Sequence, residues 1–279
     1  MISTTVTECP RSTPEPMVVG RIVLSAVSLA ALITMGLGAE TPACADEIRI
    51  LSAAALQSAL PEITRGFEGA SGHTVRISYA TIGAITQRVL AGETADVVIG
   101  STLSMPALIQ SGKIDPGSQL TVCRTGIGVV VPSATPTPDI ESIEQFKHAV
   151  LAARVVVYAD PVRGGAAGVH IGSVFKKLGI ADQLKSQLTL AAGGDVTEVT
   201  LAQGAGALGL TQISEIVGKA GAEFVGPLPQ ELQNETVFVA GTPAGVTPTP
   251  AVRAFLAFLK NPVAAAAIQA RGMQVDQRR

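Results

Sequence analysis

The sequence has 279 residues, of which 47% are hydrophobic, 15% are charged and only 3% are aromatic, and its formal net charge is -2. A chain of this length can bury one large α/β domain or two ordinary lobes, whose core must be built from Ala, Val, Leu and Ile because tryptophan is absent. Since nucleic-acid-binding proteins need a basic surface and usually stacking aromatic side chains, the composition excludes nucleic acid as a partner.

The N-terminal segment has the pattern of a secretory signal peptide. An apolar run follows Arg21, and Ala43, Cys44 and Ala45 form the small-x-small pattern of a cleavage site. We therefore expect residues 1–45 to be a signal peptide and the mature chain to start near Asp46, in the periplasm. The alternative is an uncleaved membrane anchor, because the run approaches the length that spans a bilayer.

Cleavage at this position would leave one cysteine. Of the three cysteines in the sequence, only Cys123 lies beyond the signal peptide, within an apolar, strand-like segment. An internal disulfide is then excluded, and a lone cysteine in such a segment is typical of a small core residue. We interpret Cys123 in that way and not as a nucleophile.

From residue 46 onward, strand patterns alternate with helix patterns. A helix is expected at 56–72, where Leu56, Leu60, Ile63 and Phe67 keep a spacing of three to four residues. The other elements expected in this part are strands at 47–53, 73–80 and 95–101, helices at 83–92 and 105–114, and a strand at 120–131. The βαβαβ order predicts a parallel sheet with helices on its faces.

A proline-rich segment at 131–139 is expected to cross to a second lobe, where the same plan repeats. Strands are expected there at 154–160, 188–194 and 207–212, and helices at 168–178 and 195–204. A second crossing is expected within 226–235, before a strand at 236–243 and two closing helices. The sequence thus predicts an α/β protein in which residues 46–135 and 236–279 form lobe I and residues 136–235 form lobe II. A ligand cleft between the lobes would lie at the carboxyl ends of the strands.

Four strand-to-helix turns consist mainly of Ala, Gly and Thr. They span residues 52–56, 79–84, 160–170 and 192–198. Small residues let backbone N–H groups at helix N-termini approach a ligand closely, and the helix dipole favours negative charge there. One such turn is ordinary in an α/β protein, but four in register favour a binding site for an anion.

These turns, together with segments 50–101 and 195–216, resemble the periplasmic molybdate-binding proteins of ABC importers. The similarity covers essentially the whole mature chain. It implies a type II periplasmic-binding fold, whose two lobes close on a small oxyanion held by hydroxyl and backbone N–H groups. It also implies a monomer that works with an ABC permease and an ATPase.

The resemblance assigns binding roles that this sequence keeps only in part. The family's first serine corresponds to Ala55, and its second serine corresponds to Ile82, which lies beside Thr81. Its two backbone donors correspond to Ala167 and Val196, and its tyrosine corresponds to Gln212. The two backbone positions are kept and three side-chain donors are lost, at a cost of about 1–3 kcal/mol for each buried oxygen left without a partner. This departure favours an anion other than molybdate.

Two further side chains suit a carboxylate ligand. Arg163 can bind a carboxylate in a bidentate manner, and His170 can donate a hydrogen bond; the alternative for Arg163 is a solvated loop arginine. The complete set of expected ligand-binding residues is Ala54, Ala55, Thr81, Ile82, Gly83, Arg163, Ala166, Ala167, Gly168, His170, Val196 and Gln212.

The resemblance extends to a variant group that includes exported aconitate isomerases, which move the double bond of a tricarboxylic acid. That reaction needs a base with a pKa near neutral and cations that hold the acid. The acid–base candidates are His170, Glu215 and Asp160, and the candidate clamps are Arg163, Arg88 and Arg124. Binding for transport, binding for sensing and isomerisation therefore stay open, with transport preferred.

The sequence predicts neither a cofactor nor a metal. The G-x-G-x-x-G pattern at 204–209 ends a helix and precedes a strand, the reverse of the dinucleotide fingerprint. The three histidines and the one mature cysteine show no metal-ligand spacing.

Overall fold

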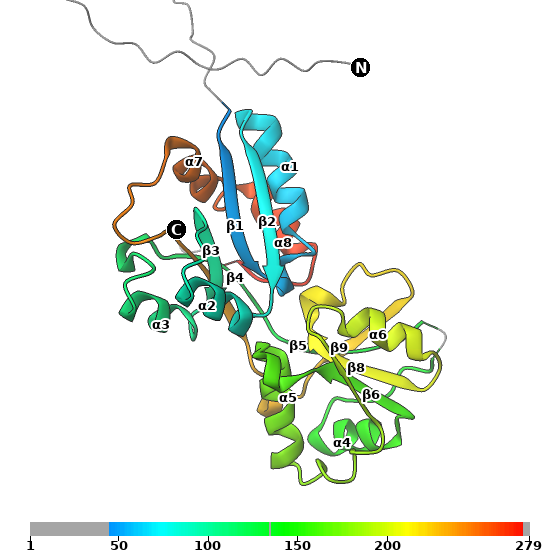
Figure 1. The fold of residues 1–279 in the computed structure, drawn as a ribbon. Helices are drawn as coiled ribbons and strands as arrows, with labels where there is room; N and C mark the ends of the chain where they lie inside the picture. The colour runs from blue at the N-terminus through cyan, green and yellow to red at the C-terminus, as the bar shows by residue number, and fades with distance from the viewer. Residues whose placement is uncertain (1–44, 134, 276–279) are drawn as a thin grey trace, which may run out of the picture. The chain divides into compact units, whose positions relative to one another are not determined.

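The computed structural model of the chain describes residues 45–133 and 135–275. Residues 1–44, which hold nearly all of the predicted signal peptide, lie outside the described residues. Within them, two five-stranded sheets carry the remaining elements (Figure 1).

The first sheet has the strand order β2-β1-β3-β10-β4. Its strands are β1 (Glu47–Ala53), β2 (Thr74–Ala80), β3 (Val97–Ser101), β4 (Leu120–Thr125) and β10 (Thr236–Gly241). The helices that belong to this part are α1 (Leu60–Ser71), α2 (Ile82–Leu90), α3 (Met105–Gln110), α7 (Pro250–Phe258) and α8 (Pro262–Gln269), with the 3-10 turn η1 (Ala54–Leu56) after β1.

The second sheet has the order β7-β6-β8-β5-β9. Its strands are β5 (Ile127–Pro132), β6 (Val155–Ala159), β7 (Leu188–Ala191), β8 (Ala207–Gln212) and β9 (Ala222–Pro227). The helices α4 (Ile143–Ala152), α5 (Ala166–Lys177) and α6 (Val196–Gln203) belong to it, with the 3-10 turns η3 (Pro161–Arg163), η4 (Ile213–Glu215) and η5 (Gln230–Leu232).

Both sheets have the same plan, and each is mixed instead of fully parallel as predicted. In the first, β2, β1 and β3 are parallel and β10 runs antiparallel to β3 and β4. In the second, β7, β6 and β8 are parallel and β5 runs antiparallel to β8 and β9. The antiparallel strand of each sheet is joined in sequence to an element of the other sheet, since β5 follows β4 and β10 follows β9. The chain therefore passes between the sheets twice.

The first passage lies at Gly126, not in the proline-rich segment 131–139 as predicted. The segment 120–131 is mostly apolar, with Arg124 and Thr125 near its middle, and was expected to form one strand, but it forms β4 in the first sheet and β5 in the second. Residues 127–132 therefore pair in the second sheet, although the predicted boundary placed them in lobe I. The second passage, between η5 and β10, lies within the predicted range 226–235.

Helix boundaries follow local capping chemistry. Helix α1 begins at Leu60, four residues after the predicted start, because η1 intervenes and Pro61 occupies its first turn; it ends at Gly72, whose φ of 74° is left-handed. The Thr81 hydroxyl caps α2 by accepting the Ala84 N–H at 3.2 Å. Helix α4, which the sequence analysis missed, has a capping box made by Ser142 and Gln145.

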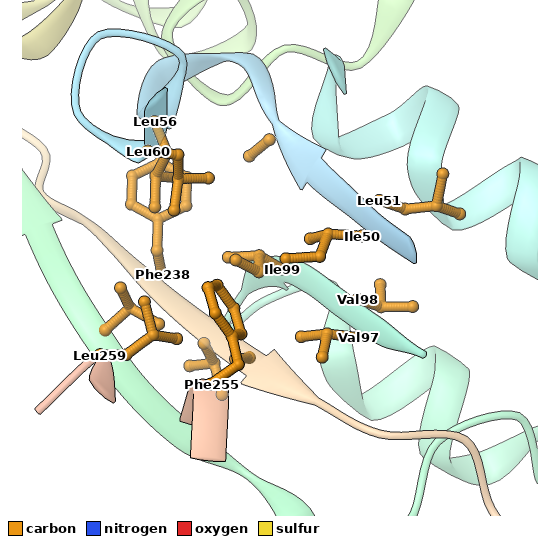
Figure 2. Close-up of a cluster of buried hydrophobic side chains, with 14 of the residues drawn as sticks. Ile50, Leu51, Leu56, Leu60, Val97, Val98, Ile99, Phe238, Phe255 and Leu259 are labelled. Atoms are coloured by element: carbon orange, nitrogen blue, oxygen red, sulfur yellow. The ribbon is translucent and has the colours of Figure 1, made fainter. Parts of the chain in front are cut away.

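Each sheet has its own hydrophobic core. Figure 2 shows the first, in which Ile50 and Ile99 from neighbouring strands pack with Phe238 of β10 and Phe255 of α7. The second is built around residues such as Val129, Phe146 and Phe175. As predicted, Cys123 is a core residue, and burial raises the pKa of its thiol to about 12.

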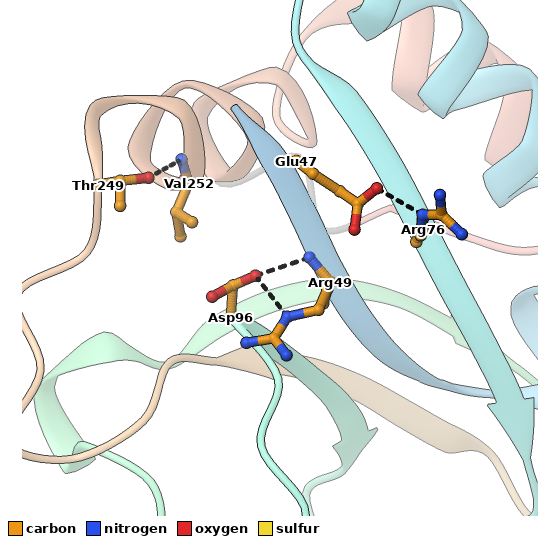
Figure 3. A network of polar contacts seen from close by, with 6 residues as sticks. All are labelled: Glu47, Arg49, Arg76, Asp96, Thr249 and Val252. Carbon is orange, nitrogen blue, oxygen red and sulfur yellow. Dashed lines mark hydrogen bonds and ion pairs between the residues drawn. The ribbon is translucent and has the colours of Figure 1, made fainter. Parts of the chain in front are cut away.

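Polar contacts close the start of the first sheet (Figure 3). Asp96 accepts the Arg49 N–H at 2.7 Å and lies 3.7 Å from its guanidinium, and Glu47 pairs with Arg76 on the neighbouring strand. Thr249 caps α7 by accepting the Val252 N–H at 3.2 Å. Because the ion pairs are exposed, each contributes at most about 1 kcal/mol, and the cores hold the fold.

Among the described residues no single helix is long and apolar enough to cross a membrane; α7 and α8 reach that length only together and are bent by 54° at their junction.

The Phe255→Ala substitution tests the core of the first sheet. Phe255 is fully buried and packs edge-to-face on Phe67 at a ring-centroid distance of 5.3 Å. We expect a loss of about 3–5 kcal/mol in the free energy of unfolding, measured by urea denaturation. Leu103→Ala, at a side chain that is 87% exposed, is the control and should change it by less than about 0.5 kcal/mol. A loss of similar size in both variants would contradict this view of the core.

Candidate functional site

A small cavity lies where the strand-to-helix turns of the two sheets meet; we call it the inner cavity. Its volume is about 40 Å³, and its walls come from the residues that follow β1, β2, β6 and β7, together with the end of β8. The predicted ligand-binding residues in its wall are Ala54, Ala55, Thr81, Ile82, Ala166, Ala167, Gly168 and Gln212. The structure thus brings eight of the twelve together.

A larger cavity of about 670 Å³ adjoins it; we call it the outer cavity. Ala54, Thr81, Gly193 and Gly194 line both cavities. Besides Thr81, the polar side chains in the wall of the outer cavity are Gln57, Tyr79, Gln87, Arg163, Asp195, Glu198 and Lys219. Of these only Arg163 was predicted. The others were missed because glutamines and charged residues in exposed turns look like ordinary solvated positions, although Tyr79, Asp195 and Glu198 lie within the predicted turns.

Two hydrogen bonds join the turn before α2 to the turn before α5. The Thr81 hydroxyl donates to the Arg163 carbonyl at 2.7 Å, and the Gly83 N–H donates to the Gly164 carbonyl at 3.1 Å. A Cβ added to Gly83 would lie 3.0 Å from the Cα of Gly164, closer than ordinary packing allows. The two backbones can approach this closely only because both positions are glycine.

The glycines of the other turns serve the same close packing. A Cβ on Gly168 would lie 2.2 Å from the Ala159 carbonyl oxygen, so the start of α5 packs directly on the end of β6. Gly193, at a φ of 110°, leaves room for the Thr81 methyl group, which would lie 2.7 Å from a Cβ there. The small residues predicted at these turns are therefore needed to form the walls of the inner cavity.

Gln212 and Glu215 lie in the wall contributed by the end of β8 and η4. Gln212 is 4% exposed; its Nε2 donates to the Thr236 hydroxyl at 3.3 Å, and its Oε1 has no partner among the described residues. An unpartnered buried acceptor costs about 1–3 kcal/mol. Turning the amide over would let Oε1 accept the Thr236 hydroxyl and let Nε2 donate to a bound anion, which would remove this cost.

The Glu215 carboxyl is the buried acid of the site. It keeps a little accessible surface and accepts hydrogen bonds from the Thr211 hydroxyl and the Gln212 N–H. Desolvation by burial raises its pKa, and these two hydrogen bonds oppose that rise. Of the three acid–base candidates it is the one that lines the inner cavity.

The other predicted residues lie outside the inner cavity. Gly83 and Arg163 line the outer cavity. His170 lines a third cavity, where its Nε2 lies 2.7 Å from the Leu232 carbonyl oxygen, and Val196 is fully buried in the core. Asp160 accepts the Val162 N–H at 3.0 Å.

The candidate clamps Arg88 and Arg124 also have partners elsewhere. Arg88 is held by Glu93 and by the Ser78 hydroxyl, and Arg124 lies 3.9 Å from Glu235. Neither lines the inner or the outer cavity. In the described part of the chain no group of three or more His, Cys, Asp or Glu side chains could hold a metal ion.

The comparisons with known proteins agree with this architecture. The family model described as bacterial extracellular solute-binding protein matches residues 48–274. An aconitate isomerase from Pseudomonas sp. is 27% identical over 255 residues, covering 86% of this chain and 95% of that protein. A molybdate-binding protein from Rhodobacter capsulatus is 27% identical over 259 residues, covering 89% of this chain and 96% of that protein.

A solved structure shows the same fold. The periplasmic molybdate-binding protein of Azotobacter vinelandii superimposes with a TM-score of 0.70 at 22% identity, covering 82% of this chain and all of that one. The predicted fold class, a type II periplasmic-binding fold, is thereby confirmed.

The Gly83→Ala substitution tests the contact between the two turns. The helix preference of alanine over glycine is worth up to about 1 kcal/mol, but the added Cβ meets the backbone of the other turn, so we expect the free energy of unfolding to fall by about 1–3 kcal/mol. The added Cβ should also separate the turns and increase the radius of gyration measured by small-angle X-ray scattering. Gly69→Ala, in α1 with open space around it, is the control. An unchanged radius of gyration in Gly83→Ala would show that the contact does not hold the turns together.

Glu215 predicts a pH dependence of stability. Because its pKa is raised above 4.5 in the folded state, the folded protein binds this proton more tightly than the unfolded chain does. The associated stabilisation is present below about pH 4.5 and is lost as the pH rises through the folded-state pKa. Urea denaturation from pH 4 to 8 should show this fall in wild type and a flatter profile in Glu215→Gln. The exposed Glu62→Gln serves as control, and a flattening of the same size there would contradict the assignment.

Proposed function

The chain belongs to the bacterial extracellular solute-binding protein family, and we propose that it captures a small carboxylate anion in the periplasm and delivers it to an ABC importer. The observation that carries this proposal is the inner cavity, much of whose wall consists of small residues at helix N-termini. Such a wall presents backbone N–H groups and the positive end of helix dipoles to a ligand.

The start of α5 supplies the donors. The first N–H groups of an α-helix have no partner within it. Those of Ala166, Ala167 and Gly168 belong to residues of the inner cavity wall and have no hydrogen-bond partner in the described part of the chain. A carboxylate placed there would accept these hydrogen bonds, which are stronger when the acceptor is charged.

The hydroxyl groups favour a carboxylate over a tetrahedral oxyanion. A hydroxyl has one hydrogen to donate. That of Thr81 is donated to the Arg163 carbonyl, and that of Thr211 is donated to Glu215. The two threonines of the wall therefore have no donor left for a ligand, and a carboxylate, with two oxygens, needs fewer donors than an anion with four.

Glu215 favours a second candidate function, the isomerisation of aconitate. A carboxyl with a raised pKa in the wall of a binding cavity can take a proton from a carbon next to a ligand carboxylate and return it at the other end of the shifted double bond. The similarity to the Pseudomonas isomerase supports the same reading. Capture and isomerisation differ in turnover, which can be measured directly.

A thermal-shift screen tests the main proposal. The purified protein is heated with acetate, succinate, tricarballylate, trans-aconitate, molybdate and sulfate. A ligand at a hundred times its dissociation constant should add about 2.7 kcal/mol of stability, and we expect this from carboxylates. Stabilisation by molybdate alone, or by none of these anions, would overturn the proposal.

The variant Ala166→Pro tests the backbone donors. Proline is tolerated in the first helical turn, and Gly165 before it already has the extended backbone that proline requires, with φ −72° and ψ 129°. The substitution removes one N–H from the cavity wall, so the affinity for the carboxylates that bind should fall about tenfold or more, with little change in stability. Unchanged affinity would exclude this N–H as a donor.

The same samples decide between capture and isomerisation. Trans-aconitate is incubated with the protein, and formation of the cis isomer is followed by NMR. Transport predicts binding without turnover, whereas isomerisation predicts turnover that Glu215→Gln abolishes while binding persists.

A further inference from the structure

We propose that the ligand carries a second acidic group, which lies in the outer cavity and binds Arg163. The solute would then be a di- or tricarboxylate, with one carboxylate in the inner cavity and the rest of the molecule outside it. This inference rests on the proposed function, because it divides the proposed ligand between the two cavities.

The volumes of the cavities support this division. The inner cavity holds about 40 Å³, and a cavity needs at least about 10–15 Å³ to hold one water molecule, so there is room for about one carboxylate group. The outer cavity holds about 670 Å³ and shares four wall residues with the inner one. The third cavity shares only Ile82 and Ala166 with the inner one, so the outer cavity is the route that we infer for a longer ligand.

The wall of the outer cavity has two cations and two carboxylates, and one of the cations is available to an acidic group. Glu198 and Lys219 neutralise each other in an ion pair, and Asp195 accepts the Gly193 N–H at 2.9 Å. The side chain of Arg163 has no hydrogen-bond or ion-pair partner among the described residues. A guanidinium left over in this way fits a carboxylate, which it can bind through two parallel hydrogen bonds.

The backbone of Arg163 is held at the junction of the two cavities. Its carbonyl accepts the Thr81 hydroxyl at 2.7 Å, and the next carbonyl, of Gly164, accepts the Gly83 N–H. Because Thr81 lines both cavities, the base of the arginine side chain is fixed next to the point where a ligand would leave the inner cavity. The side chain itself is exposed and free to fold over the ligand.

Three uncharged side chains of the outer cavity can complete the contacts. Gln57 and Gln87 offer both donors and acceptors, and Tyr79 offers a hydroxyl. Burial raises the pKa of Tyr79 to about 12, so its hydroxyl stays protonated and able to donate at physiological pH. These groups suit a hydroxyl or a third carboxylate of the same ligand.

Isothermal titration calorimetry with butyrate, succinate and tricarballylate tests the inference, with weak ligands measured by displacement of a stronger one. Wild type should bind tricarballylate at least tenfold more tightly than butyrate. Arg163→Gln should lower the affinity for succinate and tricarballylate about tenfold or more and leave butyrate within about twofold. Arg163→Lys keeps the charge but not the two-bond geometry, so its affinity for succinate and tricarballylate should lie between those of wild type and Arg163→Gln. The exposed Arg65→Gln is the control and should match wild type.

The outcomes separate the two proposals. If wild type binds none of the three acids, the proposed function fails and this inference fails with it. If butyrate binds as tightly as tricarballylate, or if Arg163→Gln weakens all three acids equally or none of them, the second site is overturned while carboxylate capture stands.

Discussion

The hydrogen bond from the Gly83 N–H to the Gly164 carbonyl is the contact on which the site depends. Together with the bond from the Thr81 hydroxyl, it uses the carbonyls of Gly164 and Arg163 as acceptors. These carbonyls lie four residues before Gly168 and Ala167, so in a longer α5 they would accept the N–H groups of those two residues. The contact between the two sheets and the open N–H groups of the cavity wall therefore arise from the same arrangement of small residues.

Desolvation has two effects in this site. It raises the pKa of Glu215, because a buried carboxylate is costly. It also strengthens hydrogen bonds from backbone N–H groups to a bound anion, since the effective dielectric constant is low. Since protonation would also remove the repulsion between Glu215 and an anion, a bound anion should raise this pKa further. The inner cavity can thus hold a negative ligand without a positively charged side chain, and Arg163 acts only at its outer end.

The strands and turns were largely predictable, because their signals are local. The bounds of β1 and β8 match the sequence patterns, and the small-residue turns do surround a cavity. The break at Gly126 was missed because the segments on both sides of it have strand patterns, and only pairing partners reveal that β4 and β5 belong to different sheets. His170 shows the same limit. It was expected at the cleft because it follows the glycines, but the turn of α5 directs it toward Leu232.

Amide NMR of the isotope-labelled protein titrated with tricarballylate tests the central claim most directly, because it reports on individual backbone N–H groups. We expect the largest downfield proton shifts at Ala166, Ala167 and Gly168, with smaller changes at Ile82. Shifts concentrated instead around the third cavity at His170, or the absence of any shift at the start of α5, would contradict this claim.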